Sequence, residues 1–229
     1  MSVKNRNSIV TDGLVFYVDA GNEDSYAGSG TTWSDLIENV DGSFEPTLGP
    51  VYDSANGGSI VFDGADDYVD YNNLVPCPST ISCSVWLKRA TSAVQHQLIT
   101  SHGATRQQFQ FKVGVNNNIV FTINDGTGFI ATSGATTLSN GVWNNLAGTY
   151  DGTTVKLYLN GVLDATNSSG PSGNIDSSGS NMELLLAARD ASSPKVFADG
   201  NIACASIYNR ALTASEVLQN YNALKNRFI

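Results

Sequence analysis

The clearest alternation of hydrophobic and polar positions lies in residues 143–166, WNNLAGTYDGTTVKLYLNGVLDAT. Two dipeptides that favour tight hairpin turns, Asp151-Gly152 and Asn160-Gly161, divide this stretch into three short segments. In the middle segment, residues 153–159, apolar and polar side chains alternate with the period of a half-buried strand. The pattern predicts an antiparallel meander with one apolar face, which needs a second layer to cover it.

The same alternation recurs along most of the chain. It predicts further strands at residues 14–19, 59–62, 68–71, 81–87, 98–101, 108–113, 119–123, 184–187 and 201–208. We expect two hairpins among them, one joining 59–62 to 68–71 and one joining 108–113 to 119–123. Many short strands with no long helix between them predict an all-β, two-sheet antiparallel jelly-roll sandwich, as a single domain over residues 1–229 with its core in 13–210.

One helix is predicted at the end of the chain, over about residues 213–226. Thr213 and Glu216 have the spacing of a capping box, and apolar residues recur behind them at helical intervals. We expect this helix to pack on the outside of a sheet or on a neighbouring subunit. Its protein-contact residues are then Tyr221, Leu224 and Phe228, and a homo-oligomer is one of the open alternatives.

Composition and charge narrow the classes of partner. The 229 residues carry a formal net charge of −9, with 21 acidic and 12 basic side chains, which argues against a nucleic-acid partner. No run approaches the roughly 20 apolar residues of a membrane span, so no membrane insertion is expected. The first 12 residues lack the apolar segment of a secretion signal.

Three cysteines do not suggest a metal or redox centre. Cys83 and Cys204 lie in apolar, strand-like runs and are expected to be buried free thiols, while Cys77 lies between two prolines. The spacing of cysteine and histidine does not fit a zinc site.

Five segments resemble the concanavalin A-like, laminin-G-type jelly rolls. They are GLVFYVDAGNEDSYAGSGTTWSDL from Gly13, SIVFDGADDYVDY from Ser59, ISCSVWLKR from Ile81, WNNLAGTYDGTTVKLYLNGVL from Trp143 and GNIACASIYNRALTASEV from Gly200. This resemblance implies the sandwich fold, which hosts lectins, adhesion modules, glycosidases and virion proteins, and so does not name a function.

The two ends of the chain, VDAGN…SYAGSGTTWSDL near the start and IYNRALTASEVLQNYNALKNRF at the end, are similar to a branch of that family. This branch is found in structural proteins of tailed bacteriophages, including those of cyanobacteria. This resemblance implies a non-enzymatic virion protein on the capsid or tail that serves decoration, attachment or host-surface contact. Its partners would be other virion proteins and, as an open alternative, a cell-surface glycan. The protein would be made in the host cytoplasm and exposed on the particle after lysis.

A free carbohydrate-binding lectin module is the alternative function. Such a module uses an exposed aromatic platform flanked by amide and carboxylate groups. Trp86 and Tyr158 occupy the polar-face positions of their strands, with Lys156 beside Tyr158 and with Gln108 and Gln110 as further candidates. We predict these five residues as the ligand-binding set.

A structural calcium is a further expectation, although no cofactor is required. Asp63, Asp66 and Asp67 fall in one turn, and Ca²⁺ prefers oxygen ligands from loops. The resembling family carries an acidic pair in its last strand, where this chain has Ala203 and Cys204. That departure speaks against the usual calcium arrangement of the family.

A glycoside hydrolase of the glucanase type is the third hypothesis. That chemistry needs two carboxylates at a defined separation, and the glucanase pattern places Glu, Asp and Glu on alternate positions of one strand. The sequence contains no such run and no GxSxG turn. His96 and His102 lie in a polar segment and are expected at the surface or rim. The sequence therefore predicts a protein that is not an enzyme.

Overall fold

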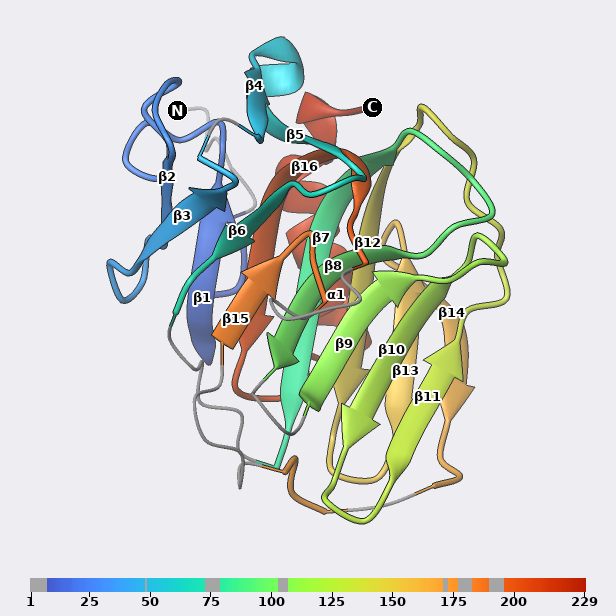
Figure 1. Ribbon diagram of the computed structural model, residues 1–229. Helices are drawn as coiled ribbons and strands as arrows, with labels where there is room; N and C mark the ends of the chain where they lie inside the picture. Colours follow the sequence, from blue (N-terminus) through green and yellow to red (C-terminus); the bar gives the residue numbers. More distant parts are fainter. Residues whose placement is uncertain are drawn as a thin grey trace, which may run out of the picture.

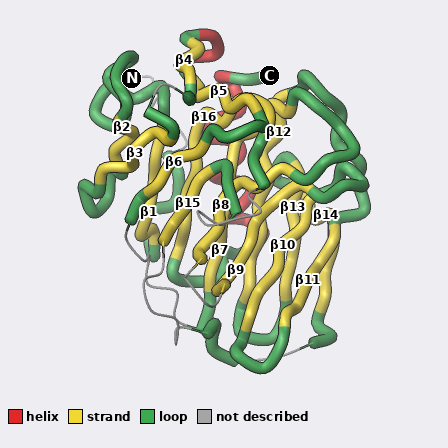
Figure 2. Tube along the Cα trace, viewed as in Figure 1, coloured by secondary structure: helices red, strands yellow, loops and turns green. Residues whose placement is uncertain are grey.

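The chain folds into two antiparallel sheets that lie face to face, with one helix behind them (Figures 1 and 2). The structure is a computed structural model that describes residues 8–47, 49–72, 79–102, 107–170, 173–176, 183–189 and 196–229. None of the helices in these ranges has the length and apolar character needed to cross a membrane. The sandwich and its single C-terminal α-helix confirm the fold class predicted from the alternation.

Sheet A contains the predicted meander. Its order is β14-β13-β12-β7-β16-β5-β4, and β1 also pairs with β16. The bounds of its strands are β1 (Leu14–Asp19), β4 (Val51–Asp53), β5 (Ser59–Asp63), β7 (Ile81–Arg89), β12 (Trp143–Tyr150), β13 (Val155–Leu159), β14 (Val162–Asn167) and β16 (Asp199–Tyr208). The antiparallel pairs β12–β13 and β13–β14 confirm the meander at residues 143–166.

Sheet B lies in front of sheet A in Figure 1, in the order β11-β10-β9-β8-β15-β6-β3-β2. The bounds of its strands are β2 (Thr32–Ser34), β3 (Asp41–Glu45), β6 (Tyr68–Asp70), β8 (His96–His102), β9 (Gln107–Val113), β10 (Ile119–Asn124), β11 (Phe129–Ser133) and β15 (Glu183–Leu186). Strands β9 and β10 form the hairpin that the sequence predicts.

The core fills the space between the two sheets. Alternate residues of β7 and β13 point into it, and Val85 and Leu157 are among its fully buried members. The sheets approach closely at Gly148 of β12, where an added Cβ atom would lie 2.7 Å from the ring of Phe121. Phe121 in turn meets Phe111 edge-on, with ring centroids 5.5 Å apart. A larger residue at Gly148 would therefore push the two layers apart.

The predicted hairpin of residues 59–62 and 68–71 is wrong. Strand β5 pairs with β4 and β16 in sheet A, whereas β6 pairs with β3 and β15 in sheet B. The turn between them therefore crosses from one sheet to the other. A turn signal between two apolar runs looks the same whether the flanking strands pair or separate, because it specifies only a reversal of direction. The acidic turn, which carries Asp63, Asp66 and Asp67, consequently lies at one end of the sandwich.

The C-terminal helix α1 (Ala214–Leu224) begins with the predicted capping box. Thr213 caps the helix and exchanges hydrogen bonds with Glu216, whose carboxylate also receives two bonds from Arg210, at 3.0 and 2.6 Å. The bonds from Arg210 hold the pKa of Glu216 down at about 2. A 3-10 turn, η2 (Lys225–Arg227), continues the chain, and a second one, η1 (Ala55–Gly57), follows β4. The helix is slightly shorter than predicted because its last turn tightens.

Candidate functional site

The outer face of sheet A is closed by the end of the chain (Figure 1). The indole ring of Trp86 stacks on Phe228, with centroids 4.3 Å apart, and on Tyr221, with centroids 5.7 Å apart. Arg227 pairs with Asp19 of β1 at 2.8 Å and fixes this segment on the sheet. The predicted contact residues Tyr221 and Phe228 therefore pack against their own domain, and Leu224 packs beside them.

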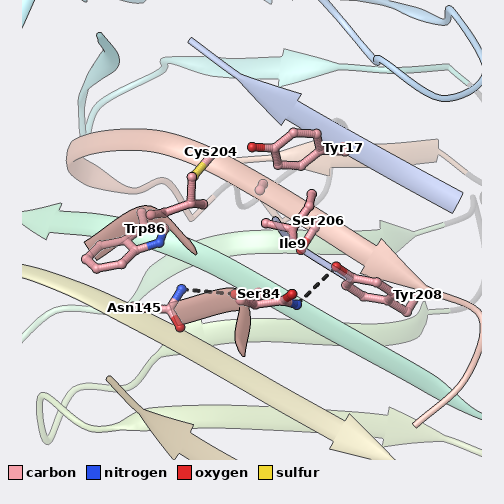
Figure 3. A pocket seen from close by; sticks show the side chains of 11 residues that line it. Ile9, Tyr17, Ser84, Trp86, Asn145, Cys204, Ser206 and Tyr208 are labelled. Atoms are coloured by element: carbon pink, nitrogen blue, oxygen red, sulfur yellow. Dashed lines mark hydrogen bonds between the residues drawn. The ribbon is translucent and has the colours of Figure 1, made fainter. Parts of the chain in front are cut away.

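The expectation that Trp86 and Tyr158 are exposed is wrong. Only 1% of Trp86 and 2% of Tyr158 is accessible to solvent. The cavity beside Trp86 has a volume of about 10 Å³ (Figure 3), which is room for about one water molecule and for no sugar. Lys156 lies two residues before Tyr158 on strand β13 and is half-buried. These three residues thus do not form an open binding platform.

Gln108 and Gln110 belong to the opposite sheet and are also buried, at 1% and 5% exposure. Gln108 accepts a hydrogen bond from Ser101 at 2.8 Å, and Gln110 accepts one from Lys112 at 2.8 Å. The five predicted ligand-binding residues are therefore divided between two sheets. Strand alternation gives the face of a residue within its strand, but neither its sheet nor the segment that covers it.

The predicted metal residues do come together. One carboxylate oxygen from each of Asp63, Asp66 and Asp67 lies within 4.8 Å of the others. Gly64 adopts a positive φ of 77°, which allows the tight turn, and the backbone N–H of Ala65 donates to Asp63 at 2.8 Å. Three converging carboxylates fit a hard cation such as Ca²⁺, so the calcium expectation stays a prediction.

Asp67 is the buried member of this cluster. It is 4% exposed, and its Oδ2 accepts the backbone N–H of Asp63 at 3.0 Å. Burial, reinforced by repulsion from Asp63 and Asp66, raises the pKa of Asp67 to about 6. A cation bound by the three carboxylates would remove this repulsion and favour the ionised form of Asp67.

An open hollow of about 460 Å³ lies beside the acidic turn. Three segments bring its walls together: the turn after β5, the loop between β7 and β8, and the residues that lead into β16. Asp63, Asp199, Thr91 and Gln95 supply polar groups. The other described residues that line it are Gly64, Ala65, Val94, Val196 and Phe197. A concave, partly apolar surface with a few polar groups is typical of a small-molecule site.

Two walls of the hollow are joined by His96. Its Nδ1 accepts the backbone N–H of Asp199 at 3.0 Å, and its Nε2 lies 3.1 Å from the carbonyl oxygen of Thr91. This geometry requires the neutral tautomer with its proton on Nε2. Burial, together with the positive charge of Arg89, lowers the pKa of His96. The expectation of a rim position for His96 is wrong, because the residue is fully buried; the side chain of His102 lies outside the described residues.

Sequence reasoning missed most of the hollow. Asp199, Phe197 and Gln95 come from segments that carry no recognisable motif. They meet because His96 holds the loop after β7 against the segment before β16. Only the Asp63-Gly64 turn gave a signal in the sequence. The cysteines agree with prediction in their burial, since Cys83 and Cys204 are buried thiols, while Cys77 lies outside the described residues.

Comparison with solved structures finds the same architecture in carbohydrate-related proteins. Domain 4 of AbnA, an extracellular arabinanase of Geobacillus stearothermophilus solved with arabinotriose, superposes with a TM-score of 0.71 and 20% identity, over 91% of this chain and 98% of that one. The CBM40 of the Ruminococcus gnavus IT-sialidase, bound to α2,3 sialyllactose, gives 0.59 and 16% over 70% and 94% of the two chains. Trypanosoma rangeli sialidase gives 0.66 and 11% over 96% of this chain but only 34% of its own length. At such identities the likeness establishes the fold.

Sequence comparison gives the family. No curated protein matches the chain. The model of the concanavalin A-like lectin/glucanases superfamily matches residues 63–218, which is more than half of the chain and includes the acidic turn, the loop at His96 and the last strand. The chain belongs to the concanavalin A-like lectin/glucanases superfamily.

Proposed function

We propose that this domain binds carbohydrate in the hollow beside the acidic turn. One observation carries the proposal: an open cavity of about 460 Å³ combines the carboxylates of Asp63 and Asp199 and the amide of Gln95 with the ring of Phe197. Carboxylates accept hydrogen bonds from sugar hydroxyl groups, and an amide both donates and accepts. An aromatic ring and aliphatic side chains suit the C–H face of a pyranose. Two similar structures were solved with oligosaccharides bound, which supports this ligand class.

Binding to an oligosaccharide array, followed by titration calorimetry on the best ligand, tests the proposal. Phe197→Ala removes the ring from the hollow, and we expect the lost contact between ring and sugar to cost at least about 1.4 kcal/mol of binding free energy. This loss corresponds to a tenfold weaker affinity. Phe129→Ala is the matched control, since Phe129 is 57% exposed and lies on edge strand β11, away from the hollow. Equal affinities for the wild type and the Phe197 variant would contradict this site.

We propose that the domain does not hydrolyse the sugar. The acidic cluster invites the opposite idea, because two carboxylates about 5 Å apart and an acid of raised pKa are features of retaining glycosidases. However, Asp67 is buried, is bonded to the backbone of its own turn, and does not line the hollow. Incubation with the bound oligosaccharide at pH 5 and pH 7 should therefore release no product, and any turnover lost in Asp67→Asn would contradict this view.

We propose, as the setting of this activity, a tailed-phage particle on whose capsid or tail the domain contacts other virion proteins and the host surface. The resemblance of the two chain ends to phage structural proteins supports this setting. The N-terminal and C-terminal segments also contact each other. Val10 donates its N–H to Asn220 at 2.8 Å, and Asp19 pairs with Arg227. Mass spectrometry of purified particles should detect the chain, and particles of full infectivity without it would contradict this role.

A further inference from the structure

The hollow carries a pair of like charges directly opposite each other. Asp63 of β5 and Asp199 of β16 are partners in the antiparallel ladder, and both line the hollow. Side chains of such partners emerge on the same face, with Cβ atoms about 4.5–5.5 Å apart, and like charges there repel. The two carboxylates therefore repel each other, and a positively charged group between them would relieve this repulsion.

Among the residues that the structure describes, no cation lines the hollow beside this pair. The lining residues given above include no lysine or arginine. Arg89, whose charge acts on His96, donates to Asn117 and to the carbonyl oxygen of Leu138. His96 is held neutral by its two hydrogen bonds. Within the described part of the chain, the charged residues that line the hollow are therefore both acidic, and the whole protein carries a net charge of −9.

The apolar wall limits which cations fit. Phe197 and Val94 face the same space as the two carboxylates, and Val94 is 47% exposed. A bare metal ion would gain nothing from these side chains. An organic ligand with an ammonium group on a ring fits both the carboxylates and the apolar wall. The ammonium offers three hydrogen-bond donors to the carboxylates, and the ring covers the apolar wall.

We propose that the preferred ligand of the hollow is a sugar with a free amine, whose ammonium group lies between the carboxylates of Asp63 and Asp199. This inference rests on the carbohydrate binding proposed above and names the class of sugar. Acetylation of the amine removes its charge, and a sugar carboxylate would add a third negative charge to the pair. The expected order of affinity is therefore amino sugar, then its N-acetylated form, then a uronic acid.

Titration calorimetry with a matched set of tetrasaccharides tests the order: a β-1,4 glucosamine tetramer, its fully N-acetylated counterpart and a uronic-acid tetramer. EDTA in the buffer keeps divalent cations from adding positive charge near the acidic turn. We expect the free-amine tetramer to bind at least about fivefold more tightly than the acetylated one, the effect of about 1 kcal/mol of ion pairing. The preference should shrink as salt is raised from 0.05 to about 0.5 M.

A pair of variants separates this site from the general charge of the protein. Asp199→Asn should abolish the preference for the amine, because it removes one carboxylate while keeping the shape of the side chain. Asp24→Asn removes the same charge at an exposed position outside the lining and should leave the preference unchanged. An equal loss in both variants would assign the preference to net charge and overturn the inference.

The outcomes also distinguish the inference from the proposed function. Equal, salt-insensitive binding of the free and acetylated tetramers, lost in Phe197→Ala, would overturn the amine preference and leave carbohydrate binding in place. Tighter binding of the uronic acid would overturn it as well. No binding of these tetramers or of any sugar on the array would contradict the proposed function itself.

Discussion

At the scale of single residues, two buried titratable groups beside the hollow respond to pH in opposite directions. The pKa of Asp67 is raised and that of His96 is lowered, in both cases chiefly because burial disfavours the charged form. For Asp67 the folded state keeps a proton that the unfolded chain has lost, so stability falls as pH rises from about 4 to about 6. For His96 the unfolded chain takes up the proton first, so stability falls as pH drops below about 6.5.

Asp67→Asn should stabilise the protein at pH 8 in EDTA. The amide keeps an acceptor for the N–H of Asp63 and removes the buried charge next to Asp63 and Asp66. We expect the Tm to rise by about 2–4 °C, the effect of about 1 kcal/mol in a chain of this size. The gain should vanish at pH 4, where the wild-type carboxyl is protonated; a gain of equal size at both pH values would contradict the shifted pKa.

Calcium should reverse the effect of Asp67→Asn on the Tm. If the three carboxylates bind Ca²⁺, millimolar calcium raises the Tm of the wild type at pH 8 through the linkage of binding to folding. Asp67→Asn removes one ligand and should lose most of this increase. Identical Tm values with calcium and with EDTA in the wild type would contradict a calcium site at this turn.

His96→Gln should flatten the acid side of the stability profile. The wild type loses stability below about pH 6.5 because a protonated imidazole can no longer accept the N–H of Asp199. The variant lacks this titration, although it is less stable at neutral pH because one bond to Thr91 or Asp199 is lost. Urea denaturation between pH 4.5 and 7.5 measures both slopes, and parallel slopes would contradict the role assigned to His96.

At the scale of the elements, the sequence predicted the strands well and their partners less well. Alternation identified the meander at 143–166 and the β9–β10 hairpin, because each strand there pairs with its neighbour in sequence. It failed at 59–71, where the chain changes sheets, and at Trp86, where α1 covers the polar-face position. Both failures concern contacts between distant segments, which a local pattern does not encode. The hollow was missed for the same reason.

The ion pair between Arg227 and Asp19 is one of the contacts that hold the C-terminal segment on sheet A. Asp19 is 8% exposed, so Arg227→Met leaves a nearly buried carboxylate without its partner. We expect a loss of about 2–4 kcal/mol in the free energy of unfolding, measured by urea denaturation. The double variant with Asp19→Asn should lose less than the sum of the two single losses, because the pair is coupled. Strict additivity would contradict a stabilising pair.

At the scale of the whole molecule, one face is closed and one end is open. Helix α1 and Phe228 cover the outer side of sheet A, so the aromatic residues that suggested a platform in the sequence stabilise the fold instead. The crossing from β5 to β6, the loop after β7 and the start of β16 meet at the end of the sandwich and form the hollow. The superfamily fold supplies the scaffold, and these three segments form the site proposed for the sugar.

The most direct test of the account is chemical-shift mapping of the ¹⁵N-labelled protein during titration with the oligosaccharide that binds best on the array. We predict that the largest shifts fall on backbone amides of the lining residues, including Gln95, Phe197 and Asp199. Shifts confined to the outer face of sheet B, at Gln110, Lys112 and Phe129, would contradict it and move the site to that sheet.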